Sequence, residues 1–448
     1  MRDLLTIASG GINYIFLILP SVSSIWMIFK EAVVSRSADR AMRVKHHLKR
    51  MSGRDVNEEN RVSTPLELFF DLTFAVSLTT VAQQLSRLLA QGEISAALFS
   101  FIISMLSICW AWMNHAWFAS AYDTDDWSFR LATMVHMVGV IVLTLGLPRL
   151  FESVEKGYGL DTGVMVLGYI IMRSVMIFLW LRAAKHDRTR RRVLIAHAAV
   201  VFVAQLFWTL LMFLKLPLSQ TLIIWSALGC VEFVGPIVFY HKWGVPPWHG
   251  HHIAERYSCL AIIALGECVS GTVTMLSAIV EAHGWSVEPI LIGTACIGLT
   301  FGCWWVYFLN PLGDLLHARR DRAFGWGYLH ILVFSSIVSI GAGLQVAGKY
   351  LQGKSALTAE ATLAFTAFAV GIYISSILLN YLSLLNWKWY CLFLCGPAIV
   401  PLAISLVMGK MNFSLPACLA VLAVSPFAAI IGFGTNHQFL TNPWDRGS

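Results

Sequence analysis

Residues 95–118 read SAALFSFIISMLSICWAWMNHAWF and contain no Asp, Glu, Lys or Arg. As an α-helix, a segment of this length crosses a hydrocarbon core about 30 Å thick. A lipid environment offers the backbone no hydrogen-bond partner, so a single segment that crosses it must be helical. The stretch therefore predicts a transmembrane helix.

Apolar segments of similar length recur along the chain. We expect the spans to be 67–86, 95–118, 129–149, 162–181, 193–214, 221–240, 256–279, 289–309, 324–347, 359–381, 389–408 and 415–434. The composition agrees, because only 13% of the 448 residues are charged, whereas a soluble domain carries about 25% charged residues. The sequence predicts an all-α, polytopic transmembrane bundle of about twelve spans, integral to a lipid bilayer.

The first 62 residues precede this series and are predicted to contain an additional N-terminal hydrophobic helix. An apolar stretch over residues 4–29 is followed by a basic segment at 36–54. The stretch lacks a convincing small-residue cleavage site, so we interpret it as a retained helix and not as a signal sequence. Either a spanning or an interfacial helix fits.

Lys and Arg residues concentrate in alternate connections between the spans. The clusters at 43–50, 188–192 and 319–322 share one face if the connection before Glu67 is cytoplasmic. Because cytoplasmic connections carry the excess of Lys and Arg, we expect the C-terminus to be cytoplasmic as well. The basic connections interleave with spans and carry no base-reading module, so nucleic acid is not an expected partner.

Landmark residues recur along the chain at nearly the same spacing. The matched pairs are Glu67 with Glu255, Trp110 with Trp304, and His136 with His330. Six spans per copy return the chain to its starting side, so the copies should be parallel repeats about an axis along the membrane normal. The predicted division is 1–62 N-terminal segment, 63–240 first repeat, 241–254 cytoplasmic linker, 255–435 second repeat and 436–448 tail.

Two carboxylates lie at the start of the first span. Their spacing of four places Glu67 and Asp71 on one helical face. A charge inside a span costs at least about 2.5 kcal/mol, so it normally faces a partner or a wet cavity. The helix dipole explains Glu67 as a helix-start anion. Asp71 is a candidate for lining a pathway.

Further charged residues fall within the predicted spans. Glu267 is the most deeply embedded acid, and Arg173 is a candidate partner for it. If Glu267 has no such partner, it is a candidate proton carrier. Glu232 lies in the sixth span and is more isolated, and Glu255 opens the seventh.

His136 and His330 occupy matching positions and are candidates for a proton relay or a pore. The alternative is that each is a hydrogen-bonded core residue. The His-rich segment 249–252 has no Cys or carboxylate at ligand spacing, so no metal site is predicted there.

Three acids, Asp123, Asp125 and Asp126, follow the second span. Such a cluster could hold Mg²⁺ on a diphosphate head group. We favour the alternative, in which they are solvated loop acids that include an N-cap for the next span. No other cofactor is evident.

Several blocks of the sequence carry a family resemblance. They are ELFFDLTF at 67–74, DTDD at 123–126 with Arg130, AERY at 254–257, IIALGE at 262–267, WWVYF at 304–308 and YLH at 328–330. In this order they resemble the bacterial low temperature requirement protein A family, also found in fungi. The resemblance covers roughly residues 60–435. It implies an integral membrane protein linked by name to growth in the cold, with no settled activity. The family usually has Asp after the Tyr-Phe pair, where this chain has Leu309-Asn310.

Two functional hypotheses from different classes follow. The first is a transporter or channel-like protein that uses intramembrane Asp, Glu and His residues along the repeat interface. The second is a membrane-embedded enzyme acting on an isoprenoid or lipid, in which Asp71 or Glu267 is the acid and the aspartate cluster holds Mg²⁺. A stress or scaffold protein without turnover is a third interpretation, and a homo-oligomer is compatible with each. The partner is a small molecule, ion or lipid that the sequence does not identify.

Overall fold

The computed structural model describes residues 48–440 apart from 59–60, 158, 215–216, 310 and 386–390. The described residues form helices and connections without a strand. The helices are α3 (Pro65–Ala90), α4 (Ile94–Tyr122), α5 (Trp127–Glu155), α6 (Gly163–His186), α7 (Arg191–Leu211), α8 (Leu218–Trp243), α9 (Gly250–His283), α10 (Val287–Tyr307), α11 (Leu312–Ala318), the 3-10 turn η1 (Arg320–Arg322), α12 (Ala323–Leu351), α13 (Ala359–Leu385), α14 (Cys391–Lys410), α15 (Leu415–Leu422) and α16 (Ser425–Leu440). The predicted helix at 4–29 and the tail beyond 440 lie outside the described residues.

Eleven helical segments in the described part are long and apolar enough to cross a membrane. A shorter apolar helix, Gly396–Lys410, falls where the span 389–408 was expected. The all-helical, multi-pass prediction is confirmed. The predicted linker is shorter than expected, because α8 continues to Trp243 and α9 begins at Gly250.

Local sequence explains where the first helix begins. The Thr64 hydroxyl accepts a hydrogen bond from the Glu67 N–H at 3.2 Å, and the Glu67 carboxylate accepts one from the Thr64 N–H at 2.8 Å. This reciprocal capping box satisfies two N–H groups that the helix leaves free, and Pro65 pre-sets the first turn. The interpretation of Glu67 as a helix-start anion is therefore confirmed.

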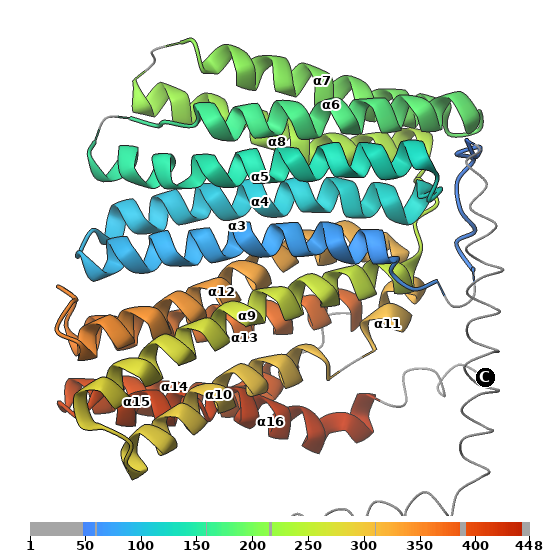
Figure 1. The fold of residues 1–448 in the computed structure, drawn as a ribbon. Coiled ribbons are helices and arrows are strands. Elements are labelled where there is room, and N and C mark those ends of the chain that lie inside the picture. The colour runs from blue at the N-terminus through green and yellow to red at the C-terminus, as the bar shows by residue number, and fades with distance from the viewer. Residues whose placement is uncertain are drawn as a thin grey trace, which may run out of the picture. The chain divides into compact units, whose positions relative to one another are not determined.

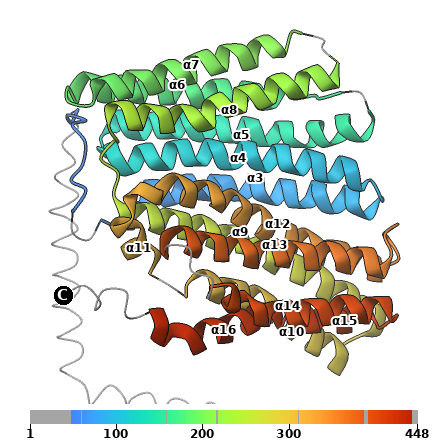
Figure 2. The same ribbon diagram turned by 180° about the vertical axis from the view of Figure 1, so that it is seen from behind.

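The long helices lie side by side, and helices that follow one another in the chain run in nearly opposite directions (Figures 1 and 2). Helices α3 to α8 form one half of the bundle, which packs against the half formed by α9 to α16. Polar contacts between α3 and α9 follow the same order along both helices. The contacting pairs are Glu67 with His252, Asp71 with Arg256, and Thr79 with Glu267. The two helices therefore run in the same direction. This agrees with parallel repeats, while the superposition of the whole halves stays a prediction.

Glycines let α9 and α12 pack backbone to backbone. A Cβ on Gly271 would lie 2.4 Å from the carbonyl oxygen of Gly341, and a Cβ on Gly341 would lie 2.5 Å from that of Glu267. Small residues at helix contacts are typical of membrane bundles, where close approach drives association. The half that starts at α9 is thus held by direct backbone contact.

The basic connections gather at one end of the bundle. The connections before α3, between α6 and α7, and between α8 and α9 all lie at this end, together with α11 and η1 (Figure 1). Contacts between segments confirm the arrangement, since Arg54 donates its backbone N–H to Ala121 and Arg320 donates to the Trp248 carbonyl. We call this end the basic end. Its assignment to the cytoplasm stays a prediction.

Candidate functional site

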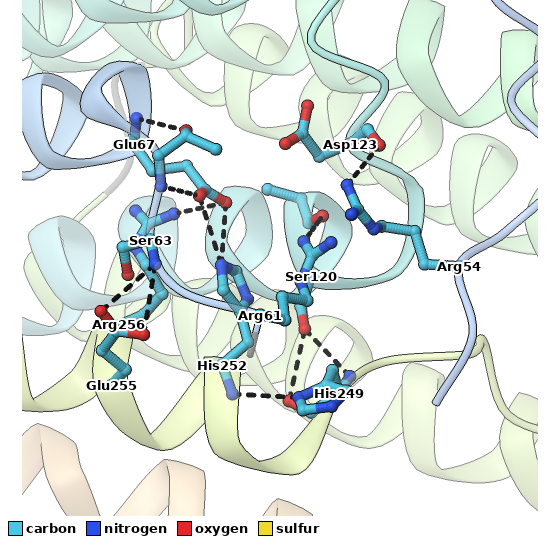
Figure 3. Close-up of polar contacts among 12 residues, drawn as sticks. Arg54, Arg61, Ser63, Glu67, Ser120, Asp123, His249, His252, Glu255 and Arg256 are labelled. Carbon is cyan, nitrogen blue, oxygen red and sulfur yellow. Dashed lines mark hydrogen bonds and ion pairs between the residues drawn. The ribbon is translucent and has the colours of Figure 1, made fainter. Parts of the chain in front are cut away.

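The first charged centre joins α3 to α9. The Arg256 guanidinium donates to both carboxylate oxygens of Asp71, at 2.5 and 3.1 Å, and lies 3.1 Å from Glu67. Trp112 donates its indole N–H to Asp71 at 2.7 Å. Figure 3 shows His252, whose Nε2 lies 3.2 Å from Glu67. These five side chains are at most 1% exposed. The two acids do share a helical face as predicted, but both contact one arginine.

The segment before α3 is tied to the start of α9 at the same place. The carboxylate of Glu255 accepts a hydrogen bond from the Ser63 N–H at 3.2 Å (Figure 3). Ser120 on α4 accepts one from the His249 N–H at 3.0 Å. Glu255 therefore fastens two segments at the edge of the centre, and this structural role was not predicted.

Asp123 lies beside this centre, outside the spans. Burial raises the pKa of Asp123 to about 6, the negative charge of Glu67 adds to the effect, and a hydrogen bond from the Asp125 N–H opposes it, as do the charges of Arg61 and Arg54. Arg54 contacts the backbone oxygen of Asp123 at 3.4 Å, not its carboxylate (Figure 3). The group thus titrates in a mildly acidic range.

The other two acids of the cluster serve local structure. Asp126 caps α5 by accepting from a backbone N–H at 2.9 Å and pairs with Arg182. Asp125 is exposed and accepts two hydrogen bonds from Arg130, at 2.8 and 2.9 Å. Within the described residues, no three His, Cys, Asp or Glu side chains are grouped so that they could hold a metal. The N-cap interpretation is confirmed for Asp126, but the expectation of solvated acids is wrong for Asp123 and Asp126, which are 5% and 4% exposed.

Glu267 does not pair with Arg173, so that predicted partnership is wrong. Glu267 accepts a hydrogen bond from the Thr79 hydroxyl at 2.5 Å and has no ion pair among the described residues. Arg173 on α6 pairs with Glu232 on α8 instead. Sequence spacing could not predict the Arg173–Glu232 pair, because the tertiary packing of α6, α7 and α8 brings these two residues together.

The Arg173–Glu232 pair forms a second charged centre inside the first half of the bundle. Arg173 donates to both oxygens of Glu232, one of them at 2.8 Å. Trp110 and Trp208 each donate an indole N–H to the same carboxylate at 2.7 Å. The guanidinium also lies 4.9 Å from the ring centre of Tyr169. The prediction that Glu232 is isolated is wrong, since four donors surround it.

The two matched histidines have different surroundings. His330 Nε2 lies 3.2 Å from the Tyr307 hydroxyl, as expected for a hydrogen-bonded core residue. His136 is 1% exposed, and neither of its ring nitrogens has a hydrogen-bond partner in the described structure. Its ring contacts those of Phe70 and His115. A relay role for His136 stays a prediction.

Three cavities lie one after another among α4, α6, α7 and α8. The far cavity, remote from the basic end, has a volume of about 470 Å³ and includes Thr162 and Trp225 in its lining. The middle cavity is about 30 Å³ and is lined in part by His136. The basic-end cavity is about 230 Å³, with Trp117 and Trp248 in its lining. The sequence analysis did not find them, although the tryptophans of these spans were a signal.

Shared residues show that the cavities adjoin. Trp110 lines all three. Arg173 and Glu232 line the far and middle cavities, and Asn114 and His197 line the middle and basic-end cavities. The second charged centre therefore lies where the far cavity meets the middle one.

The fold and these sites define a polytopic α-helical membrane protein with charged residues buried between its spans. The sequence model of the bacterial low temperature requirement A protein (LtrA) family matches residues 62–426. The chain belongs to this family. It is also 25% identical over 319 residues to an uncharacterized protein, RA0937, of Rhizobium meliloti (strain 1021), which covers 66% of this chain and 72% of that protein. No solved structure matches the chain.

Proposed function

We propose that this protein transports a small molecule or ion across the membrane through the α4–α8 half of the bundle. The observation that carries the proposal is the row of three adjoining cavities with a charged pair between the first two. Placing a charged residue inside a membrane costs free energy, so such residues are rare there. Those that occur normally mark the pathway of a substrate or an ion.

In the arrangement described, the pathway is closed at its middle. A volume of about 30 Å³ is comparable with the share of one water molecule in the liquid. Each carboxylate oxygen of Glu232 accepts one indole N–H, from Trp110 or Trp208, and one N–H from Arg173. Opening therefore requires this pair to move or to exchange its partners for the transported species. His136 lines the same constriction.

The first charged centre has a different role in this proposal. Glu67, Asp71, His252 and Arg256 contact one another at full burial, and none of them lines the three cavities described. Breaking such a pair leaves an uncompensated charge. We therefore assign it to holding α3 and α9 together while the α4–α8 half moves.

Thiol labelling in sealed vesicles tests the pathway. The parent variant carries Cys230→Ser, because Cys230 lines the far cavity. In it, Ser107→Cys reports on the far cavity and Asn114→Cys on the middle and basic-end cavities. Ile102→Cys is the matched control, since this α4 side chain is 56% exposed on the bundle surface, where lipid would cover it.

We expect a membrane-impermeant methanethiosulfonate to label Ser107→Cys from the side away from the basic end. It should label Asn114→Cys from the basic side, and it should leave Ile102→Cys unlabelled. If both cavity positions react no faster than Ile102→Cys from either side, water does not enter the cavities. The transport proposal would then be rejected.

A further inference from the structure

We infer that the basic-end cavity is a binding site for an aromatic organic anion. The binding itself stands on the geometry of this cavity. The role of the anion as the transported species rests on the proposed function. Elements far apart in the chain meet here, namely α4, α6, α7 and α8, the connection 244–249, and η1 with the start of α12.

Aromatic rings form most of the walls. Trp117 meets Trp248 edge to face, with ring centres 5.0 Å apart, and Trp180 stacks on His197 at 4.5 Å. An aromatic ligand gains both apolar burial and ring contacts in such a site. The volume of about 230 Å³ exceeds the roughly 150 Å³ of a cavity that binds benzene. A molecule with one or two fused rings therefore fits.

Three side chains of the lining also carry a covered nitrogen that lacks a partner. Arg320 Nη1, Trp180 Nε1 and His197 Nε2 are buried and make no hydrogen bond within the described part of the chain. Buried polar groups are nearly always satisfied, so each such group needs an explanation. Two of the three are obligate donors, and an anionic oxygen is the acceptor that suits them.

Arginine is in excess at the cavity, although one acid, Asp321, also lines it. Arg320 donates to the Trp248 carbonyl at 2.6 Å and lies 4.0 Å from its ring centre, which fixes the guanidinium in place. No carboxylate of the described residues pairs with it. The neighbouring Asp321 instead lies 3.1 Å from Arg322 and 3.6 Å from Arg319. A held arginine without a counter-ion favours an anion over a neutral or cationic ligand.

The next charged centre along the row can receive the same anion. Glu232 keeps its two indole donors if Arg173 turns away from it, so the arginine is the partner that can leave. An anion held by Arg320 can thus pass to Arg173. An aromatic organic anion is thus the substrate class of the proposed pathway.

Calorimetry on the full-length protein in phosphatidylcholine nanodiscs tests the site. The probe is 2-naphthoate, compared with 2-naphthylmethanol and 2-naphthylmethylammonium. We expect the wild type to bind the anion at least about tenfold more tightly than either analogue, as one charge-assisted hydrogen bond provides. This comparison needs no variant and so does not depend on folding.

Variants then locate the site. Arg320→Gln should weaken 2-naphthoate binding at least about tenfold, and Trp180→Phe, which removes the N–H together with part of the ring, should weaken it several-fold. Arg130→Gln is the matched control, because this arginine is 48% exposed and pairs with Asp125, and neither residue lines the cavity. It should bind like the wild type.

Equal binding of the anion and its analogues would overturn the inference, as would equal losses in Arg320→Gln and Arg130→Gln. Uptake of 2-naphthoate into proteoliposomes separates this inference from the proposed function. Binding that depends on Arg320, without uptake and without cavity labelling, would reject transport but keep the site. Labelling of the cavities without selective binding of 2-naphthoate would reject the anion site but keep the transport proposal.

Discussion

Replacing Glu232 by Gln isolates the energetic role of the second charged centre. The side chains of Arg173 and Glu232 are 9% and 7% exposed, and the arginine donates to both carboxylate oxygens. Gln is similar in size, but its single oxygen can accept from only one of Trp110 and Trp208, which donate to different carboxylate oxygens. The larger loss comes from the uncompensated charge of Arg173, because breaking a buried pair costs about 3–5 kcal/mol.

The double variant Arg173→Met/Glu232→Gln provides the second arm of this prediction. With Met at position 173 the variant no longer buries an unpaired charge, and removing both partners of a buried ion pair costs far less than removing one. We therefore expect Arg173→Met to restore most of the stability that Glu232→Gln loses. Glu155→Gln is the matched control, because its partner Arg87 is 36% exposed. Removal of a surface pair costs less than about 1 kcal/mol.

Thermal unfolding of the purified variants in nanodiscs measures these differences. We expect Glu232→Gln to have a clearly lower Tm, the double variant to approach the wild type, and Glu155→Gln to be indistinguishable from it. A Glu232→Gln protein with the wild-type Tm would refute the reasoning. So would a double variant less stable than Glu232→Gln, because the buried charge could then not be the cause.

Glu267→Gln should keep the wild-type Tm, because Gln can still accept from Thr79 and no ion pair is lost; a drop as large as that of Glu232→Gln would contradict this. Asp123 should lower stability as the pH rises from about 4 to about 6. Its ordinary pKa of 3.8 is raised to about 6 in the folded state, so the folded state binds more protons in this window and that stabilisation is lost on ionisation. The unfolding temperature of Asp123→Asn should show a smaller fall over the same window, and an unchanged pH profile would count against the assignment. Epitope tags inserted at 183–192 and at 153–158 should be accessible from opposite sides of the membrane, the first from the cytoplasm, and finding the 183–192 tag outside would reverse the predicted orientation.

The sequence alone determined the membrane class, because uninterrupted apolar segments leave the backbone no structure other than helices in lipid. It also placed the basic connections on one end, since an orientation rule acts on charges that can be counted along the chain. The first helix start followed from local chemistry, as Thr64, Pro65 and Glu67 contact one another within a single turn.

Only the tertiary structure decided which charges meet. Arg173 reaches Glu232 and not Glu267, and Arg256 reaches both Glu67 and Asp71. Spacing along one helix predicts which side chains share a face, but not which face of another helix lies opposite. The cavities depend on packing for the same reason. Their walls come from several helices, and the space between those walls is set by side chains that are distant in sequence.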